Sequence, residues 1–314
     1  VLDGIKNAVS KNTKLHYVKA CAIRDTTQSD IAVAVAAARQ SDVVVAVVGG
    51  SSARDFKTDY VGTGAAVVSD KRVDIIPDME SGEGYDRNSL SLLGDQLKLL
   101  DALFGIGKPV VVVCIQGRPL DMNPASEKAD ALLNAWYPGE EGGNAIADIL
   151  FGDYNPAGRL PVSVPRSVGQ LPVYYSQGEQ NKYVEGESAP LYSFGFGLSY
   201  TQFEYSHLTI ERQDEKTLIT FNITNTGERD GDEVAQLYIR DNVSSVFTPP
   251  IQLKDFERIH IRRGETKRLS FTLNDSQLTL FNQAMEEVVE PGEFTVMIGA
   301  ASDDIRLRGS FVIE

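Results

Sequence analysis

Three carboxylates and one arginine occur within the eight residues "ESGEGYDR" at positions 80–87. After histidine, a carboxylic acid is the commonest general acid/base in enzymes, and proton transfer by such a group accelerates a reaction by about 10²–10⁴-fold. Glu83 stands between Gly82 and Gly84, and glycines permit unusual backbone turns and the close approach of a ligand. The residue types are therefore suited to an acid/base loop.

Arg87 and Asp86 close this stretch. The guanidinium group of Arg87 presents a fork of N–H donors that could orient Asp86 or a substrate oxygen. A solvated acidic loop that caps a helix beginning near Ser89 would contain the same residue types. The spacing by itself leaves both interpretations open, so the surrounding elements have to be considered.

The first half of the chain alternates strand and helix patterns. Continuous β-branched runs such as "VVVAVV" and "VVVVCI" are typical of strands buried on both faces of a sheet. Ser29-Asp30 is a helix-capping pair ahead of an alanine-rich segment. Strand patterns occupy 14–23, 42–50, 108–117 and 130–139, and helix patterns occupy 29–40, 91–107 and 140–152. This order predicts a mostly parallel sheet covered by helices on both faces, an α/β sandwich.

The carboxyl ends of parallel strands meet at one edge of a sheet, where ligands of such folds bind. Residues 49–52, 116–118 and 137–139 each follow a predicted strand. We expect these three segments to gather on one rim. Trp136 and Tyr137 end a strand there, and we favour packing over sugar stacking for both aromatic rings.

The second half of the chain changes character. Proline, glycine and aromatic residues dominate from about 155 to 200, which indicates extended connecting chain. Five strand patterns follow, at 217–227, 232–241, 265–273, 292–300 and 305–313. They predict an all-β sandwich of the immunoglobulin or fibronectin type III kind. We expect an α/β sandwich domain at 1–165, an extended linker packed on the domains at 166–202, and the β-sandwich at 203–314.

Composition limits the partners. The chain has 314 residues and a net charge of -14, which argues against nucleic acid and anionic membrane surfaces as partners. Cys21 and Cys114 cannot form a disulfide framework or a four-ligand zinc site, and the three histidines lack metal-ligand spacing. Asp230, Asp232, Glu233 and Asp241 fall on both sides of a predicted strand, so we expect solvated loop ends rather than calcium ligands. We expect no cofactor and no metal.

The sequence contains no apolar run long enough for a membrane span and no signal peptide. It begins at Val1, and its first residues read like the middle of a protein. We therefore expect a processed chain or an excised fragment.

Several long motifs resemble family 3 glycoside hydrolases, the β-glucosidase and β-xylosidase family. "SGEGYDRNSLSL" is similar to the acid/base loop of that family, and "LNAWYPGEEGGNAIADILFGDYNPAGRLPVSV" is similar to its α/β sandwich domain. "PLYSFGFGLSYTQFEYSHL" resembles its domain junction, and "ITNTGERDGDEVAQLYIRD" its C-terminal fibronectin-type domain. The motifs occur in the family's order and cover essentially the whole chain.

The resemblance implies a retaining, exo-acting enzyme that removes non-reducing-end sugars from β-linked oligosaccharides or glycosides. In the family, a nucleophilic Asp lies on an N-terminal (β/α)₈ barrel and the acid/base Glu comes from the second domain. Carried onto this chain, that Glu is Glu83, with Glu80 as a weaker rival and Asp86 and Arg87 as supporting residues. The barrel is missing from this sequence, so we expect the isolated chain to be inactive without such a barrel as partner.

The resemblance also bears on the segment after the first buried strand. Arg54, Asp55 and Tyr60 could line the leaving-group side of the pocket, and a plain surface loop is the alternative for these three residues. For the parent protein the resemblance favours a periplasmic or secreted location.

Two other functions remain open from the sequence. A carbohydrate-binding or scaffolding protein with a degenerate site would show the same motifs without catalysis. A flavodoxin-like nucleotide binder would share the sheet, but the chain lacks a phosphate-binding loop. The coding sequence upstream of Val1 distinguishes the first of these from the enzyme.

Overall fold

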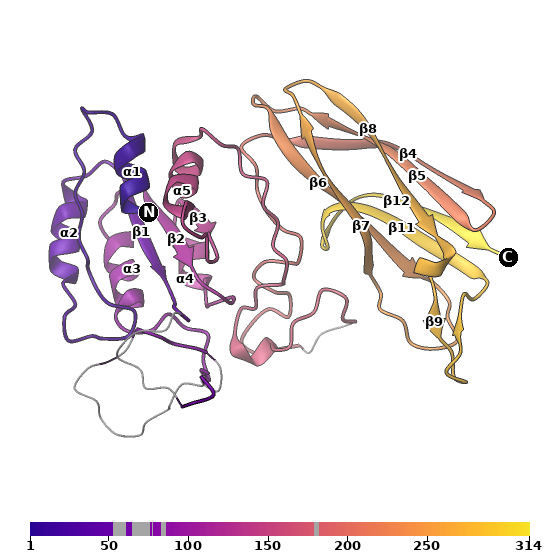
Figure 1. The fold of residues 1–314 in the computed structure, drawn as a ribbon, viewed down its shortest axis with the longest axis horizontal. Helices are drawn as coiled ribbons and strands as arrows, with labels where there is room; N and C mark the ends of the chain where they lie inside the picture. Colours follow the sequence, from indigo (N-terminus) through magenta and orange to yellow (C-terminus); the bar gives the residue numbers. More distant parts are fainter. Residues whose placement is uncertain (53–60, 65–75, 77, 83–85, 179–181) are drawn as a thin grey trace. The chain divides into compact units, whose positions relative to one another are not determined.

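The fold was examined in a computed structural model that describes residues 1–52, 61–64, 76, 78–82, 86–178 and 182–314. The chain forms two compact units (Figure 1). Unit 1 comprises residues 1–151 and 165–171, and unit 2 comprises residues 152–164 and 172–314. Within the described ranges, no helix is both long enough and apolar enough to cross a membrane.

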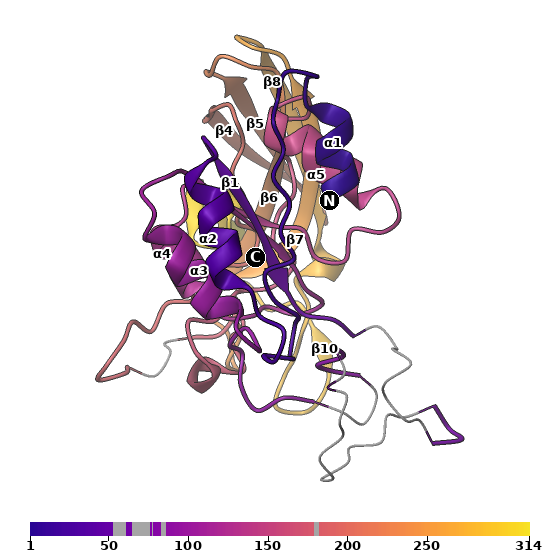
Figure 2. The ribbon, with the colours of Figure 1, turned by 90° about the vertical axis from the view of Figure 1, so that its left-hand side faces the viewer.

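Unit 1 is built on a parallel sheet with the strand order β1-β2-β3. The strands are β1 (Val44–Gly49), β2 (Val110–Ile115) and β3 (Ala131–Asn134). The helices are α1 (Leu2–Ala8), α2 (Ile31–Arg39), α3 (Gln96–Phe104), α4 (Asn123–Lys128) and α5 (Gly142–Phe151). α2, α3 and α4 lie on one side of the sheet and α1 with α5 on the other (Figure 2). The predicted α/β sandwich is confirmed.

The central strand shows why this sequence folds in this way. Val112 and Val113, which point to opposite faces of β2, are both fully buried, as expected for a strand covered on two sides. Cys114 beside them is a buried free thiol, and burial raises its pKa to about 12. On α3, Leu99, Leu100 and Leu103 form the buried stripe.

One local prediction is wrong: residues 14–23 form no strand. A strand forms only where a partner strand is available, and no strand of the described sheet pairs with these residues. The helix predicted at 91–107 is confirmed as α3, which begins at Gln96 and not near Ser89. Residues 86–94 remain irregular because their polar groups bond locally to one another and to the rim described below.

Unit 2 contains two antiparallel sheets, ordered β12-β11-β6-β7 and β4-β5-β8. The first has β6 (Gly231–Asp241), β7 (Gln252–Ile261), β11 (Gly292–Ala301) and β12 (Asp304–Ile313). The second has β4 (Phe203–Gln213), β5 (Lys216–Asn225) and β8 (Thr266–Asn274). A small ladder pairs β9 (Leu280–Phe281) with β10 (Glu287–Val288). The five predicted strands are confirmed, and β4 and β7 add to them.

The core of unit 2 is apolar and contains side chains from both sheets. Phe221 on β5, Leu237 on β6 and Val296 on β11 have no exposed surface. Alternate residues of these strands face the core, which is the pattern of a β-sandwich. The predicted all-β sandwich is confirmed.

The acidic residue Glu233 of β6 differs from its prediction as a solvated loop end. It is buried, its carboxylate pairs with Arg159 at 2.8 Å, and it accepts a hydrogen bond of 2.8 Å from the Tyr205 hydroxyl. Burial and the neighbouring Glu233 charge raise the pKa of Tyr205 well above its usual value. The pair ties the chain that follows α5 to the sandwich of unit 2.

Candidate active site

The three strands of unit 1 end together, as expected from their parallel order. Gly49 at the end of β1 is in register with Ile115 at the end of β2. Gly49 has a positive φ of 144°, and a Cβ there would lie 1.8 Å from the Ile115 carbonyl oxygen. Glycine is therefore required where β1 leaves the sheet.

The segments that follow the strands contact one another and form one rim. The Ser52 backbone N–H donates to the Tyr137 hydroxyl at 3.0 Å. The ring of Tyr137 lies so close to Gly117 that a Cβ there would be 2.5 Å from it. Tyr137 is therefore packed over the segment after β2, as predicted, although half of its surface remains exposed. Trp136, which is half-buried, has a positive φ of 51° in the turn after β3.

Two buried glutamines, neither of them predicted as a site residue, hold the rim. Gln96 on α3 accepts from the Gly49 N–H at 2.8 Å and donates to the Gly49 carbonyl at 2.9 Å. Gln116 donates to Asn134 Oδ1 at 3.2 Å and so links the ends of β2 and β3. In the sequence, Gln116 is a polar residue directly after an apolar run, and nothing in the residues around Gln96 indicated its role.

Glu80 lies at this rim beside β1. Its backbone N–H donates to the Ser51 carbonyl at 2.9 Å, and its carboxylate is in contact with Gly50. Arg87 Nη1 donates to Glu80 Oε2 at 2.7 Å, and only 6% of the Arg87 side chain and 3% of the Glu80 side chain are exposed. Arg87 Nη2 also donates to the Ser91 carbonyl. Arg87 thus pairs with Glu80, and not with the Asp86 carboxylate that its spacing suggested as one possible partner.

Asp86 has a different environment. Its side chain is 67% exposed, and its Oδ1 accepts from the Arg87 backbone N–H at 2.7 Å and from Arg118 Nη1 at 2.6 Å. These two contacts lower the pKa of Asp86, and the hydrogen bond from the Arg87 backbone has the larger effect. Arg118 follows β2, so this ion pair links the predicted loop to the rim.

For Glu80 the pKa shift is opposite in sign. Burial raises the pKa of Glu80, and the charges of Arg87, Arg118 and Arg24, in that order, counteract part of the shift. Arg24 also donates to the Met79 carbonyl at 2.8 Å. Arg24 lies more than fifty residues from this loop in the sequence, and no local pattern indicated it.

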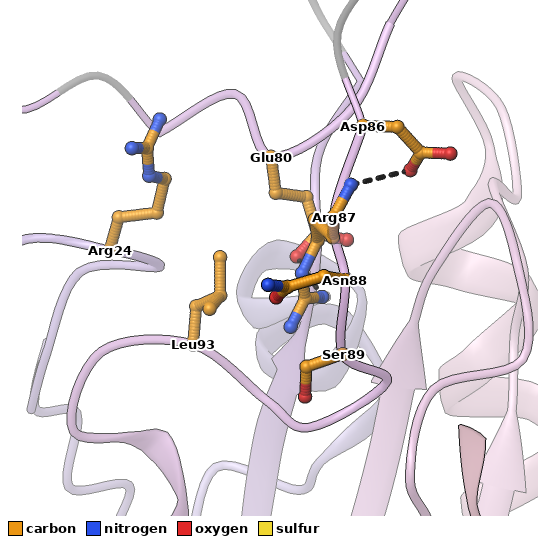
Figure 3. A pocket seen from close by; sticks show the side chains of 7 residues that line it. All are labelled: Arg24, Glu80, Asp86, Arg87, Asn88, Ser89 and Leu93. Atoms are coloured by element: carbon orange, nitrogen blue, oxygen red, sulfur yellow. Dashed lines mark hydrogen bonds and ion pairs between the residues drawn. The ribbon is translucent and has the colours of Figure 1, made fainter. Parts of the chain in front are cut away.

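An open cavity of about 560 Å³ lies beside these residues (Figure 3). Its lining consists of Arg24, Glu80, Asp86, Arg87, Asn88, Ser89 and Leu93. The wall combines apolar surface with carboxylate, guanidinium, amide and hydroxyl groups, and these polar groups can hydrogen-bond to the hydroxyl groups of a ligand. Among the residues that the structure describes, no group of three or more potential metal ligands occurs.

The structure thus brings Glu80, Asp86 and Arg87 together. Four other predicted site residues, Glu83, Arg54, Asp55 and Tyr60, lie outside the described residues.

Known proteins resemble this chain over its full length. Residues 1–200 match the profile described as glycosyl hydrolase family 3 C-terminal domain, and residues 233–302 match a fibronectin type III-like domain. A β-xylosidase of Formosa agariphila is 40% identical over 98% of this chain, and a periplasmic β-glucosidase of Salmonella typhimurium is 38% identical over 99% of it. The chain spans only 40% and 42% of those two relatives.

Solved structures agree with the sequence relatives. A β-glucosidase from Erythrobacter marinus has a TM-score of 0.85 at 36% identity, covering all of this chain and 43% of its own. A β-glucosidase from Listeria innocua in complex with glucose has a TM-score of 0.78 at 30% identity, covering 92% of this chain and 39% of its own.

Proposed function

The chain belongs to glycosyl hydrolase family 3, and from that premise we propose that it is the C-terminal portion of a retaining, exo-acting β-glycosidase. Glu83 is its general acid/base. It protonates the glycosidic oxygen as the bond to the leaving group breaks, and it later takes a proton from the water that hydrolyses the glycosyl-enzyme. The nucleophile is an Asp outside this chain, on an N-terminal (β/α)₈ barrel, with its carboxyl group about 5–5.5 Å from that of Glu83.

One observation carries the proposal: the described residues on both sides of Glu83 are anchored at the carboxyl-end rim of the sheet and line one open cavity. Glu80 is tied to the segment after β1, and Asp86 is tied to Arg118 after β2. Ligands of open α/β sheets bind at this edge. The cavity is also within the range of volumes that hold small ligands.

The two neighbouring carboxylates are poorly suited to proton donation, which supports Glu83. Glu80 is almost fully buried, and its Oε2 is engaged in the ion pair with Arg87. Asp86 has a lowered pKa, stays ionised at neutral pH and has no proton to donate. In this proposal both act as supporting residues.

The substrates we propose are β-glucosides or β-xylosides, because the relatives are named for these activities. No cofactor takes part. Arg54, Asp55 and Tyr60 are proposed to line the leaving-group side, since they follow β1 directly in the sequence. Sugar hydroxyls need several donors and acceptors, and the cavity beside Glu80 offers both.

The test uses Glu83→Ala in the full-length enzyme with a panel of aryl glycosides. Without the acid, turnover of substrates with poor leaving groups should fall by about 10²–10⁴-fold, while activated aryl glycosides lose much less. Azide should partly restore turnover, because it attacks the glycosyl-enzyme without general base assistance. Glu127→Ala, on the exposed face of α4, is the matched control and should leave the panel unchanged.

An equal loss on all substrates would contradict this assignment. It would indicate a folding defect or Glu80 as the acid.

A further inference from the structure

The rim contains a buried ion pair whose presence needs an explanation. Glu80 and Arg87 are seven positions apart in the sequence, their charged groups are 2.7 Å apart, and both side chains are almost inaccessible to water. Desolvation of two charges offsets most of their attraction, so a buried pair is seldom more stabilising than apolar residues of the same size. A geometric role accounts for it better than a stabilising one.

Besides its ion pair with Arg87, Glu80 contacts the segment that follows β1 at two points. Its backbone N–H bonds the Ser51 carbonyl, and its carboxylate occupies the space beside Gly50, where an added Cβ would be 1.9 Å from Oε1. Gly50 is itself anchored, because its N–H donates to the Ile115 carbonyl of β2 at 3.0 Å. The position of the Glu80 carboxylate is therefore set by the ends of β1 and β2.

The guanidinium group of Arg87 donates to two different partners. Nη1 bonds Glu80 and Nη2 bonds the Ser91 carbonyl, both from one planar group. A lysine has the charge but has a single nitrogen and cannot hold both partners in this planar arrangement. Arg87 thus joins Glu80 to the chain that leads into α3.

We propose that Glu80 and Arg87 form a buried brace that fixes both ends of the intervening segment at the sheet rim and so positions Glu83 for proton transfer. This inference rests on the proposed function of Glu83, which stands three residues after Glu80 and four before Arg87. The brace residues are positioning residues: they act through Glu83. A displacement of about 1 Å in a reacting group can reduce turnover by about 10²-fold. Fixing both ends of the segment between Glu80 and Arg87 should therefore raise turnover.

Glu80→Gln in the full-length enzyme tests the brace with the aryl glycoside panel. It preserves the size of the side chain and removes its charge. We expect kcat on substrates with poor leaving groups to fall by about 10²-fold, with a small change in KM and little loss on activated substrates. Arg87→Lys should give a smaller loss of the same kind.

A double variant separates positioning from a general structural effect. If the brace acts through Glu83, Glu80→Gln should cause little further loss in a Glu83→Ala background, because the positioned group is already absent. A purely structural effect would instead multiply the two losses. Asp101→Asn, which breaks an exposed ion pair with Lys128, is the control and should leave turnover unchanged.

Gly50→Ala disturbs the ion pair of Glu80 and Arg87 without removing either charge. The added methyl group would displace the Glu80 carboxylate, so the same selective loss on poor leaving groups is expected. This variant keeps the test decisive if Glu80→Gln does not fold.

The outcomes distinguish two failures. If Glu83→Ala shows no dependence on the leaving group, the proposed function fails and the positioning role fails with it. If Glu83→Ala shows that dependence but Glu80→Gln and Gly50→Ala reduce turnover equally on all substrates, or not at all, the brace is overturned and the function stands.

Discussion

At the residue scale, the environments of Glu80 and Asp86 differ although they flank the same glutamate. Burial raises the pKa of Glu80, and exposed hydrogen bonds lower the pKa of Asp86. Enzymes commonly separate the roles of neighbouring carboxylates by such differences in environment. Arg87 pairs with the Glu80 carboxylate and Arg118 with that of Asp86, so the acid/base role is proposed for Glu83.

The buried charge predicts a difference between two arginines of the rim. Arg87→Met leaves the Glu80 carboxylate buried without its partner, and should lower the free energy of unfolding of unit 1 by about 3–5 kcal/mol. Arg118→Met removes a pair with the exposed Asp86 and should lower the free energy of unfolding far less. Urea unfolding followed by the fluorescence of Trp136, the single tryptophan of the chain, measures unit 1 selectively. Equal losses for the two variants would contradict the buried-charge argument.

At the element scale, α3 does more than cover the sheet. Its first residue, Gln96, satisfies both backbone groups of Gly49 where β1 ends. The parallel strands share one edge, and this helix fixes the exit of the first strand at that edge. The rim is therefore rigid at the point where the segment after β1 begins.

Gln96→Leu should destabilise unit 1, because it leaves the Gly49 N–H and carbonyl without this partner. The expected loss in unfolding free energy is about 1–3 kcal/mol for each orphaned group. Gln40→Leu is the matched control: that glutamine is exposed at the end of α2, and its change should lie within about 0.5 kcal/mol of zero. Both free energies are measured by urea unfolding followed by Trp136 fluorescence. Equal losses for Gln96→Leu and Gln40→Leu would contradict the role of Gln96.

At the scale of the whole molecule, the proposed function makes this chain one part of a longer catalytic arrangement. It spans about two fifths of the relatives it matches. A retaining mechanism needs a nucleophile and an acid/base on opposite sides of the scissile bond. In the proposed function the nucleophile lies outside this chain.

We therefore expect the isolated 314-residue chain to have no measurable turnover on aryl β-glucosides or β-xylosides. The background is a mock preparation from cells that do not express the chain, purified in parallel to account for contaminating glycosidases. Turnover by the unaltered chain above that background would show that the nucleophile is present in these residues.

The sequence by itself determined the two architectures and the place of the rim, because strand and helix periods and the glycines after the strands are local properties. It also indicated the acidic loop, through residue types and the family resemblance. Only the tertiary structure decided that Arg87 pairs with Glu80 while Arg118 holds Asp86, and that residues 14–23 form no strand. Ion pairing and strand pairing depend on which partners folding brings near and how much water it removes, and neither is encoded in the spacing of nearby residues.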